Sequence, residues 1–232
     1  MVASSVLQMI TDALYQGTVP RVDMHVHTNW TDGADTVQAM YEQACRAGLD
    51  AMLFSEHARQ ASGEWFSDFA TEVKGCAGSC RALVGVESRI NDEDGNLEVG
   101  RDILDQCDLV VASVHRLPGG RPCELATGPE ILEAELAFMM GALDNPSVDI
   151  IGHPFGVSIR FHSLFPSPEQ LDELGRKAAR QGVAVEINTK YNPAAWDWIE
   201  RLSRHGTLLS FGADAHSIDQ VGGNLSIAGE GL

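Results

Sequence analysis

The feature that most constrains the fold is a segment type that recurs three times: a helical pattern that ends at a glycine and leads into an apolar strand. It occurs at residues 45–57 (CRAGLDAMLFSEH), 179–190 (ARQGVAVEINTK) and 203–216 (SRHGTLLSFGADAH). Glycine suits the left-handed conformation that stops a helix. The strands are apolar on consecutive residues, which indicates a parallel sheet covered on both faces.

The same alternation extends along most of the chain. We predict seven strands, at residues 22–28, 51–57, 82–88, 109–115, 148–154, 183–190 and 208–216. Helical patterns lie between most of them, at 34–47, 64–75, 129–143, 168–181 and 194–204, with a shorter one at 97–106. Strict alternation implies a parallel sheet. Seven units in 232 residues favour a closed or nearly closed barrel over an open doubly wound sheet.

No linker rich in Pro, Gly or Ser divides the chain, so we expect a single domain over residues 1–232. Residues 1–20 lack the basic and apolar regions of a signal peptide; they contain an amphipathic helix at 4–15 that we expect to cover one end of the barrel. Residues 217–232 are polar and glycine-rich and are expected to form a short C-terminal tail.

Composition limits which partners the chain can bind and which cellular compartment it suits. The net charge of −17 argues against a general binder of duplex nucleic acid, although bound metal ions could still attract a small anionic substrate. The absence of an eighteen-residue apolar run predicts no membrane span. Five cysteines without a CxxC pair are typical of a reducing cytoplasm. The sequence leaves the oligomeric state open.

Six of the eight histidines stand at or just after the predicted strand ends, together with three carboxylates. A buried imidazole without partners is costly, about 2–7 kcal/mol, so something must satisfy these rings. Residues two apart in a strand share a face, and all strand ends of a parallel barrel meet at one rim. The expected cluster comprises His25, His27, Asp32, His57, Glu87, His115, His153, Asp214 and His216.

Nine potential ligands exceed the three or four that one catalytic metal takes from a protein. We therefore expect two or three divalent ions, with Glu87 shared between two of them. Mixed imidazole and carboxylate ligation suits zinc, manganese or iron, and the sequence does not rank them. Glu56, adjacent to His57, should point to the opposite face. We interpret Asp23, deeper on the face of His25, as an acceptor that orients an imidazole.

These residues stand in motifs that resemble the PHP (polymerase and histidinol phosphatase) family. The D-x-H-x-H-T pattern and the following D-G pair match residues 23–28 and 32–33. Further matches, in order along nearly the whole chain, are Ser55-Glu56-His57, Gly85-Val86-Glu87, Ser113-Val114-His115, Gly152-His153-Pro154 and Gly212-Ala213-Asp214-Ala215-His216. Some relatives carry a histidine where this chain has Asp32, so the aspartate is a variant within the pattern.

The resemblance implies a distorted (β/α)7 TIM-like barrel with a three-metal site, in which Glu87, Asp214 and His216 stand at the reaction centre. By analogy, one ion takes His25, His27, Glu87 and Asp214; a second takes Glu87, His115 and His153; a third takes Asp32, His57 and His216.

Such a site suits hydrolysis of a phosphoester, because metal binding lowers the pKa of water to about 7 and the resulting hydroxide can attack phosphorus. We expect a small phosphomonoester substrate and a histidinol-phosphate-phosphatase-like activity. Candidate cations for the phosphate are Arg160, Arg116 and Lys190, with Arg59 and Arg121 as weaker options. His162 is a weak candidate for protonating the leaving group.

Three other functions fit parts of the pattern. A nucleotide phosphatase or a 3′-5′ or 5′-3′ exonuclease would need rings that stack on bases, and Trp65, Phe66 and Phe69 follow the second strand. A non-catalytic regulatory domain could keep the metals for stability, although a purely structural site needs fewer ligands. Hydrolysis at carbon, as in amidohydrolase barrels, usually needs a lysine near mid-barrel, where this chain offers only Lys190.

Overall fold

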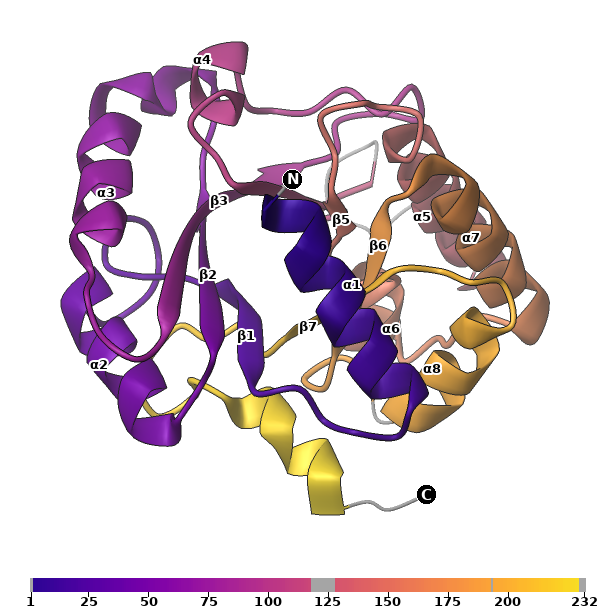
Figure 1. Ribbon diagram of the computed structural model, residues 1–232. Helices are drawn as coiled ribbons and strands as arrows, with labels where there is room; N and C mark the ends of the chain where they lie inside the picture. The colour runs from indigo at the N-terminus through magenta and orange to yellow at the C-terminus, as the bar shows by residue number, and fades with distance from the viewer. Residues whose placement is uncertain (1, 118–127, 193, 230–232) are drawn as a thin grey trace.

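The computed structural model describes residues 2–117, 128–192 and 194–229, which form a seven-stranded barrel (Figure 1). Neighbouring strands follow the order of the sequence, and all of them pair in parallel. The strands are β1 (Val22–Val26), β2 (Ala51–His57), β3 (Arg81–Arg89), β4 (Leu109–Ser113), β5 (Ile150–Ile151), β6 (Ala184–Asn188) and β7 (Leu209–Gly212). This confirms the predicted fold class.

The first strand and the segment after the last strand pair with each other and nearly close the barrel. The backbone N–H of His27 donates to the carbonyl of Ala215 at 2.8 Å, and the N–H of Ala215 donates to the carbonyl of His25 at 3.1 Å. Both bonds belong to a parallel bridge between Val26 and Ala215. Residues that follow β7 therefore lie beside those that follow β1.

Helices and 3-10 turns pack around the strands. They are α1 (Val2–Tyr15), α2 (Val37–Ala47), α3 (Gly63–Gly75), α4 (Arg101–Leu104), α5 (Gly128–Ala142), α6 (Gly156–His162), α7 (Pro168–Gln181) and α8 (Ala195–Ser203), with 3-10 turns η1 (Gln60–Ser62) and η2 (Gly223–Gly229). Gly48 and Gly182 end α2 and α7 with φ of 68° and 69°, as the sequence pattern predicts.

Several predicted elements differ in extent, including the strand expected at 208–216, which ends at Gly212 in β7. The strand expected at 148–154 is reduced to the two residues of β5. It cannot extend through His153, whose φ of 25° no extended strand can accommodate. The helix expected at 97–106 is limited to the four residues of α4. Residues 155–169, for which the sequence analysis predicted no helix, contain α6.

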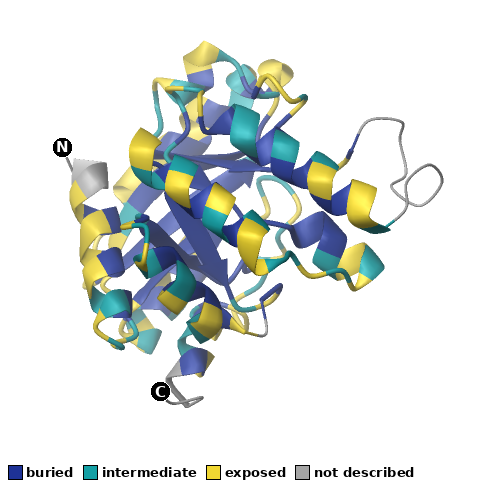
Figure 2. Ribbon diagram, turned by 90° about the vertical axis from the view of Figure 1, so that its right-hand side faces the viewer, coloured by how far each residue is buried: buried dark blue, intermediate teal, exposed yellow. Residues whose placement is uncertain are grey.

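The strands form the buried centre of the molecule, and Figure 2 shows them dark blue inside helices whose outer faces are exposed. Every residue of β1, β4, β5, β6 and β7 is buried. Burial on both faces explains why these strands are apolar at consecutive positions. The polar side chains within them, such as Asp23, His25 and Glu186, are therefore the residues that need a specific explanation.

The amino-terminal helix covers the end of the barrel opposite to the carboxyl ends of the strands, as predicted (Figure 1). Val6, Leu7, Ile10 and Leu14 are buried on it, and Thr11 Oγ1 accepts a hydrogen bond from the backbone N–H of Leu209 at 2.8 Å. Because Leu209 begins β7, this bond ties the helix to the start of the last strand.

The segment after His216 packs against the barrel more closely than the short tail that its composition predicted. Val221, Asn224 and Ile227 are buried, and the side-chain amide of Asn224 donates to the carbonyl of Val22 at 2.9 Å. The η2 turn thus packs against the barrel beside β1. Among the described helices, none is long and apolar enough to cross a bilayer.

Candidate metal centre

The structure brings all nine predicted residues together at the carboxyl ends of the strands. His25 lies within β1, His57 ends β2, and Glu87 lies near the end of β3 as the register partner of His57. The other six follow strand ends: His27 and Asp32 after β1, His115 after β4, His153 after β5, and Asp214 and His216 after β7. The parallel topology explains this convergence, because every strand ends at the same rim.

Glu87 occupies the middle of the cluster and is buried. Its Oε1 lies 2.8 Å from Nε2 of His153 and 3.1 Å from Nε2 of His115. Its Oε2 lies 3.1 Å from Nδ1 of His57 and 3.4 Å from Nε2 of both His25 and His27. One carboxylate thus faces five imidazoles from four strands' ends, with its two oxygens directed to different groups, which is the arrangement a bridging ligand needs.

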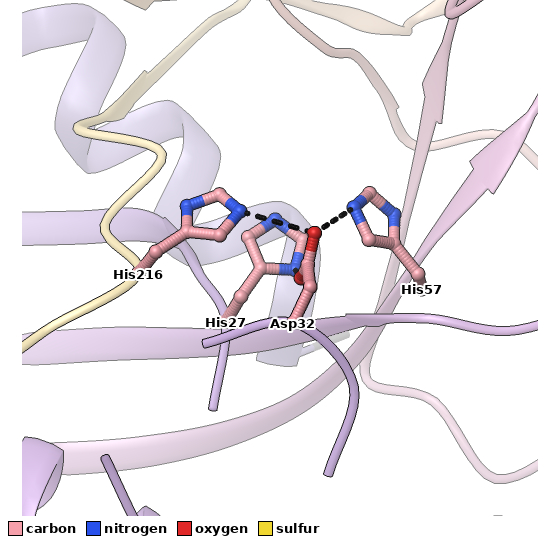
Figure 3. A group of neighbouring side chains, drawn as sticks. All are labelled: His27, Asp32, His57 and His216. Atoms are coloured by element: carbon pink, nitrogen blue, oxygen red, sulfur yellow. Dashed lines mark ion pairs between the residues drawn. The ribbon is translucent and has the colours of Figure 1, made fainter. Parts of the chain in front are cut away.

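Asp32 holds a second group together (Figure 3). Its Oδ2 lies 3.4 Å from Nε2 of His57 and 3.5 Å from Nε2 of His216, and its Oδ1 lies 4.0 Å from Nδ1 of His27. In Figure 3 the three imidazoles surround this one carboxylate. Ligand atoms of these four residues lie within 4.8 Å of one another, so they could hold one ion.

Asp214 joins the cluster from the closing segment of the barrel. Its Oδ1 lies 3.3 Å from Nε2 of His27 and 3.8 Å from Nε2 of His25. Its Oδ2 accepts hydrogen bonds from Nζ of Lys190 at 2.9 Å and from the hydroxyl of Tyr191 at 2.7 Å. Asp214 and His153 adopt φ of 51° and 25°, which is rare for residues with side chains and costs about 1–3 kcal/mol each.

Glu186, within β6, orients two of these residues and was missed by the sequence analysis. Its Oε1 lies 3.0 Å from Nδ1 of His25, and its Oε2 accepts a hydrogen bond from the backbone N–H of His153. A carboxylate on the second nitrogen of a ligating imidazole fixes the ring and makes it a better ligand. An acidic residue between the apolar residues Val185 and Ile187 of the buried strand AVEIN was the signal that could have found it.

Asp23 does not have the role we expected. Its carboxylate accepts backbone N–H groups instead of an imidazole: Ala213 and Gly222 at 2.9 Å each, and His25 at 3.4 Å. It therefore fastens the segments after β7 to β1, and Glu186 holds the imidazole. Glu56 faces away from the cluster as predicted, because it accepts hydrogen bonds from the backbone and hydroxyl of Thr28 and from the hydroxyl of Thr31.

The donor set fits divalent metal ions. Nε2 of His25, both ring nitrogens of His27 and Nδ1 of His153 are buried without a hydrogen-bond partner. Ligands bound tetrahedrally at 2.0–2.2 Å lie roughly 3.3–3.6 Å apart, which matches the 3.1–3.8 Å between imidazole nitrogens and carboxylate oxygens here. Orphaned nitrogens at ligand spacing are what a metal site leaves when its ions are removed.

The pKa shifts of His27 and of the carboxylates agree with this assignment. Burial lowers the pKa of His27 to about 4, so its imidazole is neutral at pH 7. Hydrogen bonds from His216 and His57 hold the pKa of Asp32 well below its usual range. Burial alone would raise the pKa of Glu87, but the facing imidazoles of His115 and His25 lower it by a larger amount, so this pKa lies well below its usual range. Ionised carboxylates are the form that binds metal; they raise the pKa of His25, His57, His153 and His216 in spite of burial, so a bound ion would displace protons from these rings.

Two cavities adjoin the cluster, and both are lined by Asp32, His57, Glu87 and His115. The first, of about 400 Å³, also contains Arg160, Lys190 and Tyr191. The second, of about 520 Å³, contains Arg116, together with side chains from β3, α3 and the loops after β1 and β2. All three predicted phosphate-binding cations therefore lie at cavity walls beside the cluster.

Other candidates are placed differently. His162 lines neither cavity, and Arg121 falls outside the described residues. Phe66 and Phe69 are fully buried and pack in the core, whereas Trp65 lines the second cavity. Tyr191 was not predicted; its hydroxyl accepts from Nη1 of Arg160 at 3.4 Å while donating to Asp214.

This fold and site define an α/β barrel whose strand ends carry imidazoles and carboxylates able to hold a metal cluster. The model of the PHP domain matches residues 23–190, and the chain belongs to this family. It is accordingly a phosphoesterase, a hydrolase that acts on phosphoric ester bonds.

The chain is similar to a protein named as a DNA polymerase and exonuclease and to proteins named as probable phosphatases. It is 30% identical over 86% of its length to the DNA polymerase/3′-5′ exonuclease PolX of Bacillus subtilis, of which it spans 35%. It is 27% identical over 87% of its length to a probable phosphatase of Clostridium novyi, of which it spans 81%. A chain in a cryo-EM structure of archaeal ribonuclease P with mature tRNA has a similar fold, with a TM-score of 0.51, 11% identity, and coverage of 87% of this chain and 77% of that one.

These relatives bear on the partners predicted from charge. The prediction that the chain does not bind duplex nucleic acid finds no support in these relatives, because one of them is a DNA polymerase and exonuclease by name. That exclusion stays a prediction from the net charge of −17.

Proposed function

We propose that the chain hydrolyses a small phosphomonoester at a cluster of two or three divalent ions, zinc, manganese or iron, held by the nine residues of the candidate centre. The observation that carries the proposal is the position of Glu87, whose two oxygens face imidazoles on both sides at 2.8–3.4 Å. A single structural ion would not require a carboxylate shared in this way.

The ligands divide into overlapping groups. His27, Asp32, His57 and His216 form one, which contains the third set implied by the PHP resemblance. His25, His27 and Glu87 form another, to which Asp214 adds an oxygen. His115 and His153 form the remaining group around Oε1 of Glu87. His57 can also join Glu87 and His115 in holding an ion.

When bound, divalent ions supply positive charge to the phosphoryl oxygens and lower the pKa of a water molecule toward neutrality. In the reaction, a water oxygen forms a bond to phosphorus and the bond from phosphorus to the substrate's alcohol oxygen breaks. The products are inorganic phosphate and an alcohol, whose oxygen takes a proton. Glu87, Asp214 and His216 are our candidates for the residues nearest to the reacting atoms.

The side chains of the first cavity then bind and orient the phosphate. Arg160 reaches the cluster through the hydroxyl of Tyr191, which in turn donates to Asp214. A guanidinium in this place can hold two phosphate oxygens at once. Lys190 pairs with Asp214 at 2.9 Å, so it positions this carboxylate as well as adding positive charge to the wall of the cavity.

The test is release of inorganic phosphate from a panel of phosphomonoesters, including histidinol phosphate, by protein loaded with manganese, zinc or iron. We expect turnover, and we expect His25→Ala to lose both activity and bound metal. A panel without turnover by protein that contains the metals would overturn the hydrolase proposal and favour a non-catalytic metal-binding domain.

A second candidate, a nucleotide phosphatase or exonuclease, is favoured by one observation. The indoles of Trp30 and Trp65 stack on each other at 5.8 Å between centroids, and both line the second cavity. Aromatic side chains beside a phosphoesterase centre suit a substrate that contains a base. A nucleotide and histidinol phosphate, compared at equal concentration, separate the two readings.

A further inference from the structure

A buried carboxylate that does not belong to the metal cluster lies on α5. Glu135 is 1% exposed, and its neighbours on the helix include the buried side chains of Leu136 and Phe138. Its Oε1 accepts the backbone N–H of Val157 at 3.0 Å, and its Oε2 accepts the backbone N–H and the hydroxyl of Ser158 at 2.9 and 2.6 Å. Burial raises the pKa of this carboxyl, and the three donors oppose that rise. A carboxylate in an apolar helix needs such donors, so the segment that supplies them explains its presence.

These donors belong to the first turn of α6. The backbone N–H groups at the start of a helix have no partner within it and need one from elsewhere. The N–H of Gly156 donates to the carbonyl of His153 at 2.8 Å, and those of the next two residues donate to Glu135. Phe155, which precedes the helix, has a φ of 60° and forms no capping bond with its side chain. Glu135 thus does, from another helix, what a capping side chain usually does.

The position of α6 decides where Arg160 lies. A helix of seven residues is too short to be stable on its own. Four of these residues line the first cavity, namely Gly156, Val157, Arg160 and Phe161. Arg160 is exposed, and its Nη1 donates to the hydroxyl of Tyr191 over a long 3.4 Å. Its guanidinium also lies 5.3 Å from the ring centroid of Phe161, on the same helix. The place of the guanidinium therefore depends on how firmly α6 is held.

We propose that Glu135 is a positioning residue for phosphate binding, because it fixes the first turn of α6 and so holds Arg160 at the wall of the first cavity. The inference rests on the proposed hydrolysis, in which Arg160 binds the phosphoryl group. Glu135 lines neither cavity beside the cluster, so it acts through the helix and not on the substrate. A glutamine in its place has one acceptor oxygen, and its NH₂ group would face a backbone N–H donor. The first turn of α6 would then lose a partner.

The test measures KM and kcat of metal-loaded protein with p-nitrophenyl phosphate. Glu135→Gln should raise KM roughly ten-fold, because bonds to a charged group are lost. It should change kcat little, because the ligands of the cluster are untouched. Made in the Arg160→Gln background, the same substitution should raise KM no further, because the residue through which it acts is absent. Glu133→Gln is the matched control, an exposed acid two residues earlier on α5, and should leave KM unchanged.

Hydrogen exchange gives a readout that does not depend on activity. The amides of Val157 and Ser158 should exchange faster in Glu135→Gln, whereas those of the buried strand β6 should keep their protection. Ser158→Ala removes the hydroxyl bond and keeps both backbone bonds, so it should raise KM by a smaller factor, about two- to three-fold. This variant carries the test if Glu135→Gln does not fold. Bound metal is measured in every variant and should be unchanged.

Binding of inorganic phosphate to the metal-loaded protein, measured by calorimetry, separates this inference from the proposed hydrolysis. Weaker phosphate binding in both Glu135→Gln and Arg160→Gln, without turnover of any ester by the unsubstituted protein, would support the positioning role and overturn the hydrolysis. Turnover with an unchanged KM in folded Glu135→Gln would overturn the inference while leaving the hydrolysis intact. A KM that rises by the same factor with and without Arg160 would do the same.

Discussion

Nδ1 of His25 lies 3.0 Å from Oε1 of Glu186, and both side chains are buried within the barrel. This contact turns the Nε2 of His25 toward Glu87 and Asp214. The other oxygen of Glu186 receives the backbone N–H of His153, so one carboxylate positions two residues of the cluster that come from different strands. Glu186 is therefore a positioning residue for the candidate metal centre.

Glu186→Gln should weaken metal binding by roughly 10- to 100-fold, because a neutral amide no longer fixes the His25 ring or raises its basicity. The measurement is the dissociation constant for zinc or manganese. Asp149→Asn is the control, since Asp149 accepts the backbone N–H of Val110 at 2.8 Å before the start of β5, away from the rim. Equal affinities in the two variants would contradict the role assigned to Glu186.

Asp32→Ala and Glu87→Ala should differ in the number of ions lost. Asp32 joins one group of ligands, whereas the two oxygens of Glu87 face separate groups. We expect the first variant to lose one ion per chain and the second to lose more than one. Elemental analysis of purified protein gives the stoichiometry. The same loss in both variants would show that Glu87 does not bridge.

Gly212→Ala should disturb the centre without touching a ligand. A Cβ at this position would meet the Oε1 of Glu186 and would lie 2.7 Å from the Cβ of His25. Since both neighbours are packed and buried, we expect reduced metal content and a lower free energy of unfolding, by about 1–3 kcal/mol. Gly75→Ala is the matched control, because a Cβ there meets nothing within 4 Å. Denaturant titration and elemental analysis measure both effects.

Thr11→Val should destabilise the fold while leaving the centre intact. Thr11 Oγ1 accepts from the backbone N–H of Leu209 and donates to the carbonyl of Leu7 at 2.7 Å. Valine keeps the shape but leaves the buried N–H unsatisfied, which costs about 1–3 kcal/mol. Urea denaturation should show this loss with metal stoichiometry unchanged. An unaltered midpoint would mean that α1 contributes little to the barrel.

The sequence by itself determined the barrel and the membership of the cluster. Glycine-ended helices leading into doubly buried strands specify a parallel sheet, and a parallel barrel gathers its strand ends at one rim. His25, His57 and Glu87 could therefore be assigned to one site from their positions alone. This succeeds because strand periodicity and strand direction are local properties of the chain.

The tertiary structure decided which groups touch. Glu186 lies 161 residues from His25 in the sequence. Asp23 accepts hydrogen bonds from backbone N–H groups that closure of the barrel brings close to it. The left-handed backbone at His153 and Asp214, and the pairing of Lys190 with Asp214, likewise depend on packing between distant segments. Hydrogen-bond partners are set by ångström-scale distances in the folded chain, which no spacing along the sequence encodes.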